Sequence, residues 1–131
     1  RVDTGFWHSM VCVMHKSLES FTGGVLDTNA FLFHAPKGTI LFDAPQGSDR
    51  ALAERKIDLL VLTHGHFDHV ADAAAIIRRH QCPVFMHALT VQMVKEQDFF
   101  KRWGFMLEVE PVEPDALIDE GKHTWLDEPV E

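Results

Sequence analysis

The sequence has few cysteines, no long hydrophobic run and a shortage of basic residues. Its two cysteines, Cys12 and Cys82, stand alone, so they form neither a disulfide framework nor a CxxC metal site, and we expect free, largely buried thiols. No apolar run approaches the ~18 to 20 residues of a membrane span, and the first residues lack the charged-then-apolar order of a signal peptide. These absences predict a cytoplasmic protein without a membrane partner.

Charge and length narrow the class further. Twelve basic residues against twenty acidic ones give a formal net charge of −8, which argues against nucleic acid or an anionic membrane surface as the main partner. A chain of 131 residues with 46% hydrophobic content suits one small domain. Residues 1–10 show no periodicity and stay unassigned, with Met10 as a possible native start, so we place the domain at residues 11–131.

Hydrophobic periodicity predicts an α/β domain. Residues 57–62 (IDLLVL) form a nearly continuous aliphatic run, which is typical of a strand covered on both faces. A helix expected at 70–80 and a strand expected at 83–87 complete a βαβ unit. The remaining expectations are a strand at 11–15, a loop or hairpin connection at 17–27, a hairpin of strands 29–34 and 39–44, a helix at 48–55 capped by the Ser48 hydroxyl, a helix at 88–103, and short strands near 106–109 and 124–126.

The stretch Thr63-His64-Gly65-His66-Phe67-Asp68-His69 concentrates the chemistry of the chain. It puts three imidazoles and one carboxylate into six positions straight after the 57–62 strand, and just before a helix expected to begin near Val70. Neutral imidazole and carboxylate are the ligands that borderline divalent metals such as zinc prefer. Open α/β sheets bind ligands outside the carboxyl ends of their strands. The candidate metal ligands are therefore His64, His66, Asp68 and His69, and Asp68 is also the candidate catalytic residue.

These residues match the HxHxDH motif of the metallo-β-lactamase superfamily, which the sequence resembles over about residues 29–87. The resemblance implies the amino-terminal half of an αββα sandwich, a mixed sheet with helices on its outer face. It also implies two zinc ions per complete site, or iron or manganese in their place, with His64 and His66 on the first ion and Asp68 and His69 on the second. Asp43, in the run LFDAP, would hold a ligand histidine in the right tautomer.

The function that the resemblance implies is hydrolysis of a small molecule, in which a metal-activated hydroxide attacks an ester, thioester or lactone-type carbonyl, as in glyoxalase II-like enzymes. In this family a second half of the fold supplies further ligands, and the sequence shows none of them, because His123 lacks the glycine-rich setting of the third histidine. Two alternatives stay open. One is an iron-dependent oxidoreductase of the persulfide dioxygenase kind. The other is a non-catalytic half-domain that associates with another chain, for example as a homodimer through its uncovered face.

Overall fold

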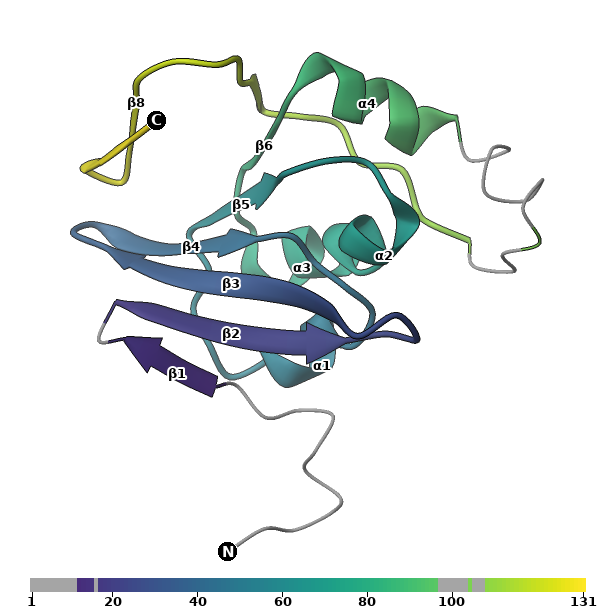
Figure 1. The fold of residues 1–131 in the computed structure, drawn as a ribbon, viewed down its shortest axis with the longest axis horizontal. Helices are drawn as coiled ribbons and strands as arrows, with labels where there is room; N and C mark the ends of the chain where they lie inside the picture. Colours follow the sequence, from purple (N-terminus) through teal and green to yellow (C-terminus); the bar gives the residue numbers. More distant parts are fainter. Residues whose placement is uncertain (1–11, 16, 97–103, 105–107) are drawn as a thin grey trace, which may run out of the picture.

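The computed structural model describes residues 12–15, 17–96, 104 and 108–131 (Figure 1). Seven strands form one sheet in the order of the chain, and two further strands pair as a separate hairpin. The strands from β1 to β4 are antiparallel, whereas those from β4 to β7 are parallel. The elements are β1 (Cys12–His15), β2 (Leu18–Gly23), β3 (Thr28–Ala35), β4 (Gly38–Phe42), α1 (Ser48–Ala51), β5 (Leu59–Leu62), α2 (Phe67–Val70), α3 (Ala73–His80), β6 (Val84–Met86), α4 (Ala88–Lys95), β7 (Ala116–Leu117), β8 (His123–Trp125) and β9 (Glu128–Val130).

Strand β5 lies at the centre of the core. All four of its side chains are buried, with Leu60 and Leu62 in the cluster that includes the helices, and Leu59 and Val61 in the cluster on the opposite face. This explains the continuous aliphatic run, because burying each such side chain contributes about 1.5–3 kcal/mol. Helices α1 to α3 pack on the first face, and the β8–β9 hairpin packs on the second through Trp125 (Figure 1). The predicted α/β class, a mixed sheet with helices on one face, is confirmed.

Parallel pairing decides where the candidate ligands meet. Leu41 of β4 lies opposite Leu60 of β5, and Leu62 of β5 lies opposite Met86 of β6. The carboxyl ends of these strands therefore lie at one edge of the sheet. The segments that leave this edge begin with Asp43 after β4, with Thr63 and His64 after β5, and with His87 after β6.

Some local expectations are wrong. Half of the connection expected at 17–27 is strand β2, whose Phe21 is buried in the core. Ser48 does not cap α1 with its side chain, because its hydroxyl donates to the Pro45 carbonyl at 2.6 Å and Gly47, with φ of 96°, takes the cap position. The helix itself stops at Ala51. The short edge strand β7 is not predicted by the sequence, since two residues carry no periodicity.

The other expectations, for the carboxyl-terminal part of the chain and for the two cysteines, have mixed outcomes. The helix expected at 88–103 ends at Lys95, and residues 97–103 lie outside the described residues. Of the strand expected near 106–109, residues 106–107 lie outside the described residues and residues 108–109 are not in a strand. The strand expected near 124–126 is present as β8. Cys82 is a free buried thiol, as expected, and burial raises its pKa. The side chain of Cys12 lies outside the described residues. Among the described helices, none is long and apolar enough to span a membrane.

A charge network ties β2 to β3 and to the segment after α1. The carboxylate of Glu19 receives both terminal nitrogens of Arg55, with Nη1 at 3.1 Å from Oε1, and it also contacts Nε2 of His34. The Glu19 side chain is 13% exposed. The hydrogen bond from Arg55 lowers the pKa of Glu19, against burial, which raises it, and with further help from His34. The network therefore stabilises the folded chain when Glu19 is ionised.

Glu19→Gln is expected to lower the free energy of unfolding by about 1.5–3 kcal/mol at neutral pH, because it removes a charge-assisted pair. The pKa of Glu19 is depressed in the folded state, so its stabilising effect is present above the unfolded pKa and is lost as the pH falls through the folded one. Urea unfolding at several pH values should show the two proteins converging in acid. Glu54→Gln, at an exposed position, is the control, and a difference from wild type that is independent of pH would contradict the assignment.

Candidate metal centre

The centre is built around Asp43, which follows β4 and is 5% exposed. Its backbone has φ of 64°, a left-handed conformation that aspartate tolerates better than most residues. Its amide hydrogen-bonds the Val61 carbonyl at 2.9 Å, so the backbone stays joined to β5 past the end of β4. The side chain is thereby aimed at the first residues after β5.

Three donors occupy the Asp43 carboxylate. Oδ1 accepts from the Thr63 amide at 2.8 Å, while Oδ2 accepts from the Thr63 hydroxyl at 2.6 Å and from Nδ1 of His69 at 2.8 Å. One potential ligand atom each from Asp43, His64 and His69 lies within 4.8 Å of the others. Because both oxygens of the carboxylate already accept hydrogen bonds, Asp43 fits the role of a residue that orients the histidines better than the role of a metal ligand.

The hydrogen bonds define the tautomers of two histidines. His69 donates through Nδ1–H to Asp43, so in the neutral ring Nε2 carries no proton. The single proton of the Thr63 hydroxyl goes to Asp43, so the hydroxyl oxygen accepts from Nδ1 of His64 at 2.9 Å. Nε2 of His64 is then also free of a proton. One carboxylate thus prepares two imidazoles for metal binding, one directly and one through Thr63.

The rings gather at one place. The ring centroids of His64 and His69 are 4.0 Å apart, and those of His64 and His66 are 4.7 Å apart. Burial lowers the pKa of His64, and the neighbouring His69 and His66 act in the same direction, although the carboxylates of Asp43 and Asp68 oppose them. His64 is therefore held in the neutral form that can bind a metal ion.

Asp68 approaches the cluster from helix α2. Its Oδ2 accepts from the Thr28 hydroxyl at 2.6 Å and lies 3.5 Å from Nε2 of His69. Among the described residues, Oδ1 has no hydrogen-bond partner, so it is the oxygen available to a metal ion. Helix α2 begins at Phe67, so Asp68 and His69 lie in its first turn, whereas the sequence places them before a helix starting near Val70. That expectation is corrected because Phe67 and Val70 both pack into the core.

Thr28 is the site residue that the sequence does not reveal. It opens β3, is 6% exposed, and reaches Asp68 across forty positions of sequence. Its neighbour Asn29 lies on the other side of the strand, where its Oδ1 accepts from Thr22 at 2.6 Å. A lone threonine at a strand start carries no signal of such a role. Only the tertiary contact identifies it.

The structure thus groups the ligand atoms of His64 and His69 with Asp43, places His66 beside His64 and Asp68 beside His69, and leaves the other described histidines elsewhere. His34 belongs to the Glu19 network, and His87 caps α4 by accepting from the Leu89 amide at 3.1 Å. His123 donates to the Asp119 carbonyl at 2.8 Å. The donor set around Asp43, neutral imidazole nitrogen plus one carboxylate oxygen, fits a borderline divalent metal such as zinc, iron or manganese. The metal-binding role of each residue stays a prediction.

Comparison with known protein families gives one match over most of the chain. The family model described as "Metallo-beta-lactamase superfamily" matches residues 23–130. The match includes β3, β4, β5 and α2, and so all the residues of the candidate metal centre.

Curated relatives cover shorter stretches. A UPF0173 metal-dependent hydrolase of Anaeromyxobacter sp. (strain K) is 42% identical over 57 residues, which are 38% of this chain and 21% of that protein. The probable metallo-hydrolase YflN of Bacillus subtilis is 26% identical over 104 residues, which are 67% of this chain and 39% of that protein. Both relatives carry the name of a metal-dependent hydrolase or metallo-hydrolase. The chain matches well under half of the length of each.

Solved structures share the fold. A β-lactamase from Chitinophaga pinensis superposes with a TM-score of 0.71 at 21% identity, covering 95% of this chain and 52% of that one. The protein TTHA1623, solved in a di-iron-bound form, superposes with a TM-score of 0.64 at 28% identity, covering 76% of this chain and 53% of that one. The chain spans about half the length of these neighbours.

Proposed function

Because the chain belongs to the metallo-β-lactamase superfamily, we propose that it carries the amino-terminal half of a divalent-metal hydrolase site. In this proposal His64 and His66 hold one metal ion, and Asp68 and His69 hold a second. The observation that carries it is the hydrogen-bond network of Asp43, which leaves Nε2 of both His64 and His69 without protons at adjacent positions. In a site that binds no metal, there would be no reason for one buried carboxylate to orient two imidazoles.

The proposed reaction is hydrolysis of an ester, thioester or lactone-type carbonyl of a small molecule. When bound, the metal ions polarise the carbonyl group and lower the pKa of the attacking water. Asp43 keeps the imidazoles in their binding tautomers, and Thr28 occupies one oxygen of Asp68. The other oxygen, Oδ1, is left to bind a metal or to accept a proton from the water. Asp68 is thus the residue proposed to act in the chemical step.

Zinc is the metal we propose, since imidazole and carboxylate at these positions suit it. Iron is the second candidate, because the 28% identical structural neighbour TTHA1623 was solved in a di-iron-bound form. Manganese stays possible on the same donor set.

The test is zinc binding and turnover measured on the same preparation. The metal-free chain should take up zinc, and the zinc form should hydrolyse a p-nitrophenyl ester, a thioester or a lactone. A chelator should abolish that activity and added zinc should restore it. His66→Ala should lose both zinc and activity. His80→Ala is the matched control, because His80 is a half-buried imidazole at the end of α3 whose Nε2 has no partner among the described residues.

Three outcomes would count against the proposal. Zinc bound as tightly by His66→Ala as by wild type would remove the ligand assignment. Iron uptake with oxygen consumption on a persulfide would replace hydrolysis by an oxygenase reaction. A chain that binds zinc, or no metal at all, without turning over any of the three substrates would act as a non-catalytic half-domain, and a dimer in sedimentation would then indicate its association with a second copy.

A further inference from the structure

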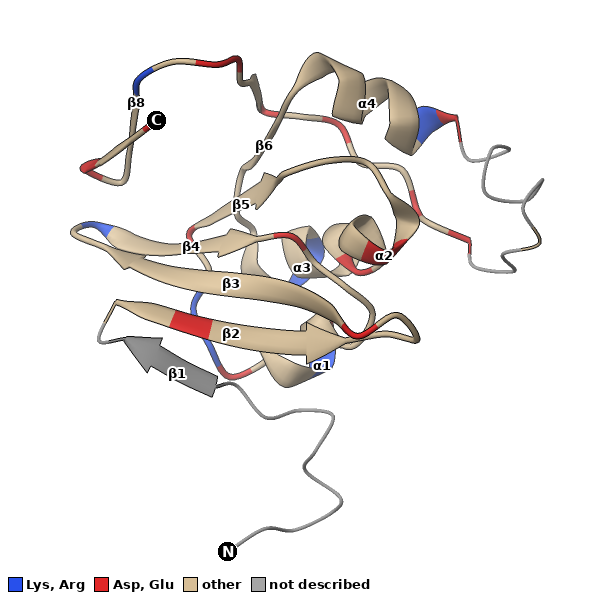
Figure 2. Ribbon diagram, viewed as in Figure 1, with Lys and Arg blue, Asp and Glu red and all other residues tan. Residues whose placement is uncertain are grey.

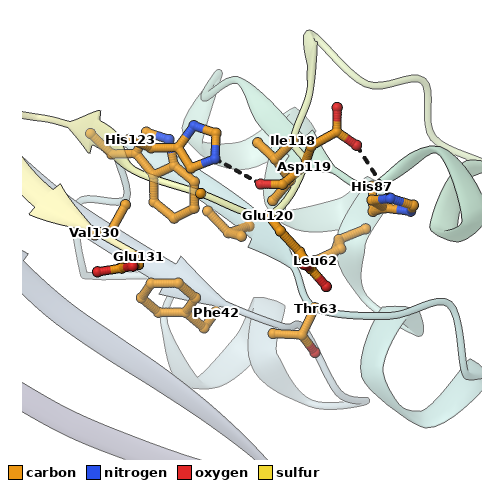
Figure 3. A pocket seen from close by; sticks show the side chains of 13 residues that line it. Phe42, Leu62, Thr63, His87, Ile118, Asp119, Glu120, His123, Val130 and Glu131 are labelled. Carbon is orange, nitrogen blue, oxygen red and sulfur yellow. Dashed lines mark hydrogen bonds and ion pairs between the residues drawn. The ribbon is translucent and has the colours of Figure 1, made fainter.

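A cavity of about 470 Å³ adjoins the candidate metal centre on the face of the sheet that carries the β8–β9 hairpin. Figure 3 shows its side chains, which come from the ends of β4 and β5 and from the segment between β7 and β9. Thr63 lines the cavity and also holds Asp43 and His64, so the two sites share a residue. A volume of this size is within the range of small-molecule sites.

The floor of the cavity is apolar. Trp125 packs with its ring centroid 6.5 Å from that of Phe42 and 6.2 Å from that of Phe85. Val61 and Ile118 belong to the same hydrophobic cluster and also line the cavity. The flat aromatic surface of Trp125 can hold a hydrocarbon group, and its π face also attracts a cation.

The rim of the cavity is negatively charged. Its lining residues include Asp119, Glu120 and Glu131, and none of the described lining residues is lysine or arginine. Within the part of the chain that the structure describes, neither Glu120 nor Glu131 has a cation or a hydrogen-bond donor as partner. Figure 2 shows that residues 108–120, which lead to β8, include Asp and Glu residues and no Lys or Arg. The cavity therefore combines an apolar floor with carboxylates and has no lysine or arginine in its described lining.

The two histidines of the cavity have hydrogen-bond or ion-pair partners of their own. His87 accepts from the Leu89 amide through Nδ1, so its proton lies on Nε2, 3.4 Å from the Asp119 carboxylate. His123 donates through Nε2 to the Asp119 carbonyl at 2.8 Å and stacks on Trp125. The Asp119 carboxylate thus already faces a ring nitrogen, whereas the carboxylates of Glu120 and Glu131 have no such partner among the described residues.

We propose that this cavity binds an apolar group that bears a positive charge, such as an aromatic or aliphatic ammonium group. The apolar part lies on Trp125 and Phe42, and the ammonium group lies between Glu120 and Asp119. The inference that this ligand is part of the substrate rests on the proposed hydrolase function. Its binding to the cavity requires no metal. Charge complementarity selects it: an anionic ligand of the same shape would face the carboxylates without any cation to compensate.

The experiment uses the metal-free chain and three matched probes: 2-phenylethylammonium, 2-phenylethanol and 3-phenylpropanoate. Amide NMR titrations should show the ammonium probe binding roughly tenfold or more tightly than the carboxylate probe, with the neutral alcohol between them. The shifts should include Gly121, whose amide lies in the cavity lining. In the double variant Asp119→Asn, Glu120→Gln, the preference for the cation should disappear. Glu54→Gln, at an exposed position after α1 that does not line the cavity, should retain it.

Equal binding of the three probes, or shifts remote from Gly121, would overturn the charge selection and the location respectively. If none of the three probes binds to the wild-type chain, the proposal as a whole is overturned. Because no metal is present, these outcomes do not depend on whether the chain hydrolyses anything. Conversely, a chain without zinc-dependent turnover can still show the cation preference, so failure of the hydrolase proposal is recognised separately.

Discussion

Asp43→Asn is expected to lower the affinity of the chain for zinc by about 10- to 100-fold, the usual effect of removing a residue that orients metal ligands. The carboxylate accepts three hydrogen bonds, from the Thr63 amide, the Thr63 hydroxyl and Nδ1 of His69. An amide side chain has one accepting oxygen and one donating nitrogen. Whichever way it turns, an NH₂ group replaces one acceptor, so either the Thr63 amide or the pair formed by the Thr63 hydroxyl and Nδ1 of His69 loses its partner.

Asparagine is the right replacement because it keeps the backbone unchanged. Asp43 has φ of 64°, and asparagine tolerates this left-handed conformation as well as aspartate does. Circular dichroism should therefore remain that of wild type. The affinity is measured by competition with a chromophoric chelator. The imidazole tautomers are read in the metal-free chain from nitrogen-15 NMR of the histidine rings, in which a mainly structural role for Asp43 would leave no change.

Asp58→Asn is the matched control. Asp58 also accepts a backbone amide with its carboxylate, from Thr39 at 2.9 Å, but it lies at the amino end of β5, at the opposite edge of the sheet. It should cost stability without changing zinc affinity. Equal losses of zinc affinity in the two variants would show that Asp43 acts through general stability. Unchanged affinity in Asp43→Asn would remove its role altogether.

Sequence locates this centre but gives only part of its construction. The aliphatic run of β5 and the ligand types after it place the cluster at the carboxyl edge of a buried strand, because those signals are local and periodic. Asp43 is suggested only by family resemblance. Thr28 is not suggested at all, because its contact with Asp68 joins residues that only the antiparallel pairing of β2 to β4 and the position of α2 bring together.

The errors in the fold have the same origin. Strand β2 is not predicted because the polar residues of its sequence, LESFTG, hide a single buried side chain, Phe21, and its pairing partner lies on β3. The sequence assigns Ser48 to a cap from residue type alone, yet its hydroxyl finds the Pro45 carbonyl within the turn. In each case a tertiary or turn contact decides between conformations that local propensity leaves nearly equal in energy.

Gly65→Ala is the second substitution for which we expect a large effect. A left-handed turn does not explain this glycine, because its φ is not in the left-handed region. The structure gives a different reason: a Cβ at this position would lie 2.4 Å from the Cβ of Met93 and 3.2 Å from the carbonyl oxygen of Thr90, both on α4. Two rigid elements therefore approach each other with no room for a methyl group.

The alanine must push α4 away from the segment that carries His64 and His66. We expect a loss of about 1–3 kcal/mol in the free energy of unfolding, as for other overpacked sites, together with weaker zinc binding because both imidazoles lose their positions. Urea unfolding and the chelator competition measure the two effects. The decisive control is Gly65→Ala combined with Met93→Gly, which removes the atom at 2.4 Å. If close approach is the cause, the double variant should regain zinc affinity even though glycine weakens α4 by about 1 kcal/mol. If the double variant binds zinc no better than Gly65→Ala, contact with α4 is not what fixes the ligand segment.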